Sequence, residues 1–187
     1  MAQYAQFSAD TLARLESIFE EMMWLAARPN TRPGAARAWY SHVAVGPLIR
    51  SVRRFTGKVS IEAINAPDEK LVLEHFNRMQ SSLSSLVATQ LKSCTRDVRA
   101  FIDLIHQCEQ VHIVTDRQNH DARRAKGDYA SAGIVLADWK DIGIDTQRLL
   151  YAKKLKGAVS NAAAYAPKSA AKLTLPLESV PHSRVTN

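Results

Sequence analysis

The sequence predicts a mainly α-helical protein with one short strand. Three observations support this prediction. Apolar residues recur at intervals of three and four along most of the chain between residues 8 and 159. Residues that cap helices, such as Ser, Asn and Asp, stand immediately before several of these stretches. The alternation of apolar and polar residues that is typical of a strand is clear only at 58–64.

Three helices are expected before that strand. Ser8 is suited to cap the first helix, whose apolar stripe continues until the Pro- and Gly-containing segment 29–34. The second helix begins near residue 35 and is interrupted by Gly46. A short third helix at 47–55 has a proline in its first turn, which helices tolerate there. Its outer face would carry three neighbouring arginines: Arg50, Arg53 and Arg54.

A long helix is expected after the strand, over 65–92. Asn65 can cap it, and an apolar stripe through Val72, Phe76, Met79 and Leu83 follows helical spacing. Further helices are expected up to Cys108, from residue 115 or 116, and from 145 to 159. The β-branched segment 111–114 is compatible with either a helix or a strand. We expect one helical nucleic-acid-binding domain over 1–166 and a basic C-terminal tail over 167–187 without regular structure.

Charge is concentrated at the C-terminal end of the chain. Residues 146–187 contain seven basic side chains and one acid, which accounts for six of the seven net positive charges. The rest of the chain is nearly balanced. A basic segment on a balanced body favours an anionic partner, most often nucleic acid. The predicted phosphate contacts in this region are Arg148, Lys153, Lys154 and Lys156.

Several classes of protein are disfavoured. The two cysteines, Cys94 and Cys108, follow no disulfide or zinc pattern and fit a reducing compartment. There is no glycine-rich nucleotide loop. No signal sequence or membrane-spanning run is recognisable, so we expect a cytoplasmic protein with no membrane partner.

Three residues spaced by four are compatible with a metal site. A continuous helix would place His112, Asp116 and His120 on one face, where they could bind a divalent metal. Asp116 is also a good helix cap, however, and a helix beginning there would separate the ligands. We therefore expect no metal and no cofactor.

A ribbon–helix–helix reader of DNA is the arrangement that the strand suggests. In such a dimer two protomers pair their strands and place the ribbon in a major groove. Lys58 and Ser60 would then face the bases, and the arginines before them would contact phosphates. Glu62 departs from this pattern because a carboxylate is repelled by phosphates unless it accepts a hydrogen bond from cytosine.

A resemblance to a known family supports the same interpretation. The segments 24–27 (WLAA) and 36–40 (ARAWY), and then 98–102 (VRAFI) and 111–117 (VHIVTDR), resemble the AcaB-like regulators of conjugative elements. With the strand and its following helix, they cover about a third of the chain. The resemblance implies a cytoplasmic, dimeric, DNA-binding activator of conjugative-transfer genes on a plasmid, with ribbon–helix–helix-like readout. We expect no enzyme activity.

Two other functions stay open. Arg37 with His42, and Arg99 with His106, match the loose Arg-x(4–6)-His spacing of the helical ribonucleases called HEPN. An arginine and a histidine near a phosphodiester could polarise the phosphate and move a proton. The third interpretation is a non-catalytic helical subunit of a nucleoprotein assembly.

Overall fold

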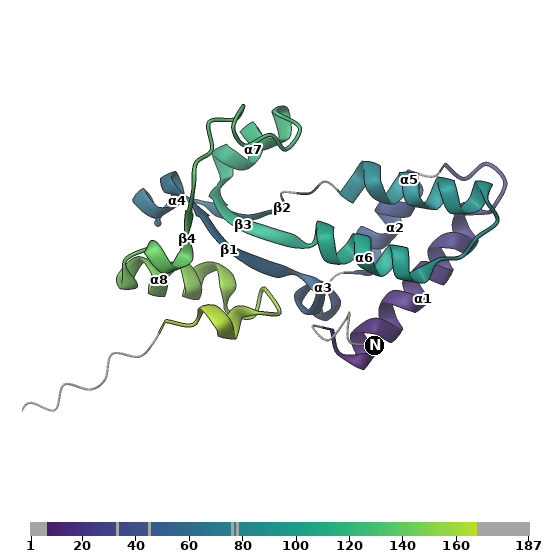
Figure 1. Cartoon of the computed structure of the whole chain (residues 1–187), viewed down its shortest axis with the longest axis horizontal. Helices are drawn as coiled ribbons and strands as arrows, with labels where there is room; N and C mark the ends of the chain where they lie inside the picture. Colours follow the sequence, from purple (N-terminus) through teal and green to yellow (C-terminus); the bar gives the residue numbers. More distant parts are fainter. Residues whose placement is uncertain (1–6, 33, 45, 76, 78, 168–187) are drawn as a thin grey trace, which may run out of the picture.

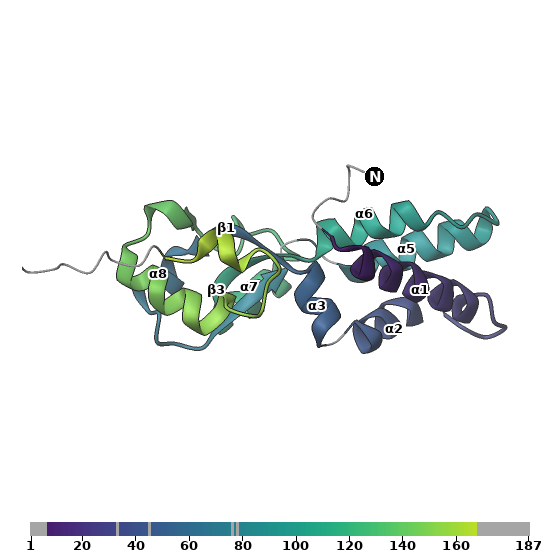
Figure 2. The same ribbon diagram turned by 90° about the horizontal axis from the view of Figure 1, so that it is seen from below.

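A bundle of helices and a four-stranded sheet lie end to end and form two lobes (Figure 1). The computed structural model describes residues 7–32, 34–44, 46–75, 77 and 79–167. The predicted tail beyond 167 therefore lies outside the described residues. Seen from below, the molecule is elongated, with the sheet at one end and helices α1, α2, α5 and α6 at the other (Figure 2).

The helical lobe is formed by two separate segments of the chain, 7–52 and 79–108. Leu15, Phe19, Leu83 and Phe101 are fully buried in its single apolar core. Ser8 caps the first helix as predicted, because its hydroxyl accepts a hydrogen bond from the Thr11 N–H at 3.1 Å. The helices are α1 (Ala9–Ala26), α2 (Ala35–Val43), α3 (Pro47–Val52), α5 (Met79–Lys92) and α6 (Val98–Cys108).

The sheet lobe, residues 54–75 and 110–165, contains the strands in the order β2-β3-β1-β4. Strands β1 and β3 run parallel, whereas β2 and β4 are antiparallel to their neighbours. One face of the sheet packs its apolar residues, among them Phe55, Val59 and Ile113, against the C-terminal helices. The strands are β1 (Arg54–Ser60), β2 (Leu71–His75), β3 (Gln110–Thr115) and β4 (Leu136–Asp138).

Short helices connect and cover these strands (Figure 1). Three of these short helices contribute to the second apolar core, through Trp139, Leu150 and Leu155. None of the described helices has both the length and the apolar character needed to cross a membrane. The helices of this lobe are α4 (Ile61–Asn65), α7 (Asp116–Arg124), η2 (Trp139–Asp141), α8 (Ile144–Leu150), η3 (Tyr151–Leu155) and η4 (Ala162–Tyr165).

The prediction of a mainly α-helical, ribbon–helix–helix-like fold is wrong, since the chain has an α/β fold. The strand predicted at 58–64 is correct only at 58–60, which end β1 (Arg54–Ser60), because residues 61–64 belong to helix α4; β1 itself lies inside the sheet. Strand β3 pairs with one edge of β1, and β4 pairs with the other edge from Lys58 to Ser60. Just before the start of β1, the Arg53 carbonyl accepts a hydrogen bond from the Ser160 N–H at 2.8 Å. No edge of β1 is left to pair with a second protomer.

The predicted long helix over 65–92 is also wrong. Its first part contains the strand β2, and only its second part is helical, as α5. Leu71 and Leu73 lie opposite Thr115 and Ile113 of β3, so the strand is fixed by partners some forty residues away. The undecided segment 111–114 is the centre of β3 and is buried. Long-range pairing therefore overrode the local helical period at Val72.

Candidate nucleic-acid interface

A polar pocket lies where the two lobes meet. We call it the junction pocket; its volume is about 290 Å³. The elements around it are the start of β1, the end of α6, the start of β3 and the segment containing η4, which lies beside β1 in Figure 2. Its walls are formed by Arg54, Phe55, Thr56, His106, Gln110, Asn161 and Tyr165.

Asn161 fastens the C-terminal wall of the pocket to β1. Its side-chain oxygen accepts from the Phe55 N–H at 2.9 Å, and its amide nitrogen donates to the Phe55 carbonyl at 2.8 Å. The Tyr165 ring then packs edge-on against Phe55, with centroids 4.7 Å apart. Gly57, with φ of +81°, makes room for this tyrosine, because a Cβ there would lie 3.2 Å from the Tyr165 hydroxyl.

Arg54 supplies the positive charge of the junction pocket. No carboxylate of the described residues forms an ion pair with its guanidinium. Its neighbour Arg53 differs, because Arg53 Nε lies 3.6 Å from a carboxylate oxygen of the buried Glu109. The planar guanidinium of an arginine matches the geometry of phosphate oxygens.

His106 is the second titratable group of the pocket. Partial burial, followed by the nearby charge of Arg54, lowers the pKa of its imidazole below the usual 6.5. The Phe7 ring packs edge-on against it at 5.7 Å. An imidazole N–H can donate a hydrogen bond to a phosphate oxygen. This hydrogen bond becomes stronger when the ring is protonated.

The other predicted contacts near β1 have different environments. Arg50 is exposed in the last turn of α3. Lys58 forms an ion pair with Asp138 of β4 at 2.9 Å. Ser60 is fully buried and caps α4 by accepting from the Ala63 N–H at 3.1 Å. Ser60 therefore cannot face bases, and its hydroxyl has a structural role.

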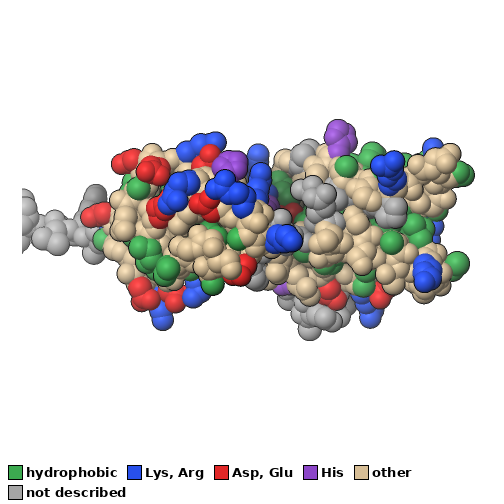
Figure 3. All heavy atoms as spheres, turned by 90° about the horizontal axis from the view of Figure 1, so that it is seen from above, with side chains coloured by type: hydrophobic (Ala, Val, Ile, Leu, Met, Phe, Trp, Pro, Cys, Tyr) green, Lys and Arg blue, Asp and Glu red, His purple; other side chains and the backbone are tan. Residues whose placement is uncertain are grey.

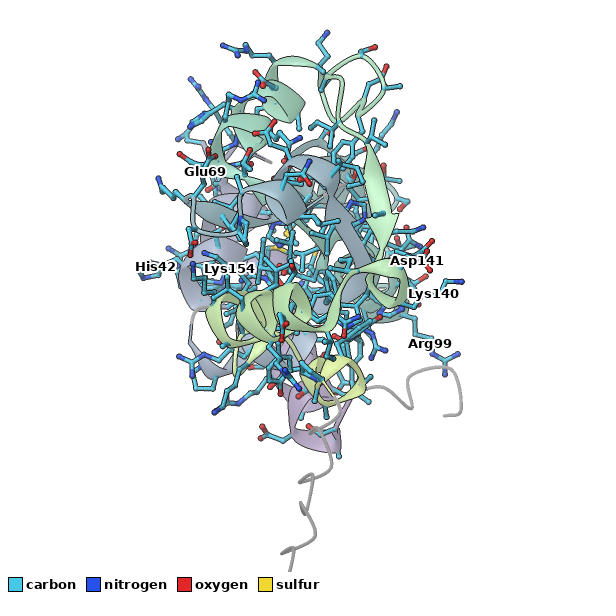
Figure 4. All side chains as sticks on the ribbon, turned by 90° about the vertical axis from the view of Figure 1, so that its left-hand side faces the viewer. His42, Glu69, Arg99, Lys140, Asp141 and Lys154 are labelled. Carbon is cyan, nitrogen blue, oxygen red and sulfur yellow. The ribbon has the colours of Figure 1, made fainter. Side chains whose placement is uncertain are left out.

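The C-terminal basic residues lie on α8, η3 and the turn that follows. Arg148 pairs with Asp145 at 2.8 Å, and Lys153 pairs with Asp68 at 2.7 Å. Lys154 and Lys156 form no ion pair within the described part of the chain, and Lys156 is exposed. In Figure 4 Lys154 lies on the α8–η3 side, away from the edge where Lys140 and Arg99 extend.

The basic helix α7 is largely neutralised. Arg117 pairs with Glu62 and, at 3.5 Å, with Asp121. Arg124 also pairs with Asp121. Figure 3 shows the resulting pattern on one face, where basic and acidic side chains alternate over the sheet lobe. This face therefore carries no uniform positive patch for a phosphate backbone.

The arginine–histidine pairs suggested by the sequence are not brought together in the junction pocket. Arg99 extends away from the body of the protein in Figure 4 and does not line the pocket with His106. His42 is exposed at the opposite side of that view. The side chain of Arg37 lies outside the described part. Arg54, from the predicted DNA contacts, is the arginine that accompanies His106.

The three residues with metal-ligand spacing are divided between two elements. His112 is buried in β3, whereas Asp116 and His120 belong to α7, with 3.9 Å between their nearest oxygen and nitrogen. Within the described ranges no group of three or more His, Cys, Asp or Glu side chains is arranged to hold a metal.

No local sequence signal indicated the far wall of the pocket. Asn161 and Tyr165 lie more than a hundred residues from β1 in the chain, and neither belongs to a recognisable motif. Comparison with known proteins adds no assignment: no family model, curated protein or solved structure matches the chain.

Proposed function

We propose that the protein is a cytoplasmic DNA-binding regulator that holds a phosphate of the DNA backbone in the junction pocket. The observation that carries this proposal is the Arg54 guanidinium, which has no carboxylate partner among the described residues and faces a polar pocket. Most protein–DNA hydrogen bonds go to phosphates and sugars, and these contacts fix the position of the protein rather than its sequence preference.

The remaining charge supports the same partner. The chain carries a net charge of +7. The exposed Arg50 lies in α3, just before β1, and the exposed Lys156 lies four residues before Ser160, whose N–H bonds the Arg53 carbonyl. These side chains would add attraction that is independent of sequence. Activation of conjugative-transfer genes and a homodimeric state are proposals that rest on the resemblance described above. They do not include a ribbon formed by two protomers, because β1 is interior.

The salt dependence of binding to a short DNA duplex tests the phosphate contact. Arg54→Gln is expected to weaken binding about tenfold and to reduce the slope of log K against log[salt] by about one. Arg14→Gln is the matched control, because Arg14 pairs with Asp10 on α1. An unchanged slope in Arg54→Gln would show that no phosphate lies at this site. Sedimentation at the DNA-binding concentration measures the oligomeric state.

RNA cleavage is a second candidate, favoured by the presence of His106 and Arg54 in the lining of one pocket, where burial and Arg54 lower the pKa of the imidazole. A neutral imidazole can accept the proton of a ribose hydroxyl while the arginine stabilises charge on the phosphate. Incubation with a labelled RNA distinguishes the two functions. Cleavage that disappears in His106→Gln, in a variant that still binds RNA, would favour the ribonuclease. RNA that stays intact would contradict the ribonuclease.

A further inference from the structure

The junction pocket contains two basic side chains that act on each other. Arg54 comes from the start of β1 and His106 from the end of α6, and both line the pocket. After burial, the charge of Arg54 is the strongest influence on the pKa of the His106 imidazole. A phosphate bound in a pocket of about 290 Å³ would therefore change the electrostatic environment of both groups.

The two ring nitrogens of His106 differ in accessibility. Nδ1 is buried and has no hydrogen-bond partner among the described residues, whereas Nε2 is not buried in this way. The Phe7 ring packs edge-on against the imidazole, with centroids 5.7 Å apart, and restricts its position. A ligand can therefore reach this imidazole at Nε2, whose N–H can donate a hydrogen bond to a phosphate oxygen.

The charges around His106 determine how a bound anion affects it. Burial and then Arg54 lower the pKa of the imidazole below 6.5, and Asp103 of the same helix raises it by a smaller amount. The Tyr165 hydroxyl is the other titratable group of the lining, and no carboxylate of the described residues lines the pocket. A phosphate there would offset the repulsion from Arg54 and attract the imidazolium, so it would raise the pKa of His106.

We propose that His106 is a second phosphate-binding residue of the junction pocket and that the phosphate is bound together with a proton taken from solvent by this imidazole. The Nε2–H then donates a charge-assisted hydrogen bond beside the Arg54 guanidinium. Protonation also places a hydrogen on the buried Nδ1, which disfavours the imidazolium until an anion is present. The inference rests on the proposed phosphate contact and makes DNA affinity increase as the pH falls.

The pH dependence of binding to a short DNA duplex, at constant ionic strength, tests the proton uptake. The strands end in hydroxyl groups, because a terminal phosphate itself titrates near pH 6. Since the complex holds one more proton than the separate molecules, the affinity of the full-length protein should rise about fivefold from pH 8 to pH 6. His106→Gln should remove this rise, whereas His120→Gln, at an exposed position on α7, should retain it. An equal rise in His106→Gln would overturn the inference.

Titration of the His106 ring by NMR spectroscopy gives a second measurement, which decides the question even if His106→Gln does not fold. In the wild-type protein the pKa of His106 should be higher with the duplex bound than without it. In unbound Arg54→Gln it should be higher than in the unbound wild type, because one cause of its lowering is removed. A pKa that does not change on DNA binding would contradict proton uptake.

The two proposals for the junction pocket can fail separately. A reduced salt slope in Arg54→Gln, together with a pKa of His106 that DNA leaves unchanged, would retain the phosphate contact and overturn only the role of His106. An unchanged salt slope in Arg54→Gln would overturn both, because no phosphate would then lie beside the imidazole.

Discussion

The Tyr40 hydroxyl donates a hydrogen bond of 3.2 Å to Glu109, which lies 69 residues later in the chain. Tyr40 belongs to α2, whereas Glu109 ends α6 and precedes β3. The same carboxylate lies 3.0 Å from Nε2 of His75 at the end of β2 and 3.6 Å from Nε of Arg53. Burial, with the neighbouring carboxylate, raises the pKa of Tyr40 well above 10. This buried group of polar side chains joins the two lobes.

Removal of the Tyr40 hydroxyl should destabilise the protein. Tyr40→Phe leaves the ring in the core but takes one hydrogen bond from a buried carboxylate, so the free energy of unfolding should fall by about 2 kcal/mol. Urea denaturation measures the change. Tyr151→Phe is the control, because the Tyr151 side chain is half-buried and should change stability by less than about 0.5 kcal/mol. An equal fall in the free energy of unfolding in the two variants would show that the hydrogen bond to Glu109 adds no stability.

Asn161→Ala should release the C-terminal wall of the junction pocket. The substitution removes both hydrogen bonds to Phe55 and leaves its N–H without that acceptor, and we expect a loss of about 2 kcal/mol. Hydrogen exchange at the Phe55 amide is the more direct measurement and should become faster. Asn119→Ala, at a half-buried position in α7, serves as the control. Unaltered protection at Phe55 would mean that this segment is held by its aromatic contacts.

Gly57→Ala tests the approach of Tyr165 to β1. The positive φ of +81° disfavours any side chain, and the new Cβ would lie 3.2 Å from the tyrosine oxygen. We expect a loss of stability of about 1–3 kcal/mol. The matched control is Gly34→Ala, because Gly34 has φ of −62° and a methyl group added there would have no neighbouring atom within 4 Å. Thermal unfolding should separate the two variants clearly, and similar melting temperatures would refute this reasoning.

Stability should decrease on acidification because of His112. Burial, and then the charge of Lys58, lowers the pKa of this imidazole to about 4 in the folded state, compared with about 6.5 in an unfolded chain. The unfolded chain therefore takes up the proton first. The loss begins as pH falls below 6.5 and is complete below pH 4, with a total of about 3 kcal/mol.

Denaturation at a series of pH values measures this effect. His112→Gln should flatten the dependence between pH 6.5 and 4, whereas His120→Gln should not, because His120 is exposed on α7. The ring of Tyr129 packs edge-on against His112 at 5.4 Å, so both variants are first compared at pH 8 to separate packing from titration. A slope that is the same in both variants would assign the acid sensitivity to other groups.

Local patterns predicted the helices better than the sheet. Ser8 and Pro47 mark the starts of α1 and α3 correctly, because capping and first-turn proline depend only on neighbouring residues. The strand β2 was missed since Val72 and Met79 also fit a helical period. Its partner β3 is distant in sequence, and no local signal reveals which segments will pair.

The candidate site was predicted only in part, for a similar reason. Arg54 was recognised by the density of charge around it, and His106 by its spacing from an arginine. Their proximity depends on the parallel pairing of β1 with β3, which places Arg54 opposite Gln110. The alternation in β1 is real as far as Val59, and Lys58 lies on its half-exposed side, but Ser60 departs from it because it is buried as the cap of α4.

The order of the segments has a consequence for dissecting this protein. Strands β2 and β3 are antiparallel neighbours, and His75 at the end of one lies opposite Val111 near the start of the other. Helices α5 and α6 are thus an insertion between the two strands of a β-hairpin, and a tight turn could replace them as the connection. The excised pair would nevertheless take Leu83 and Phe101 from the core shared with α1. Neither lobe can therefore be isolated by a single cut, and the protein has to be divided, if at all, by circular permutation.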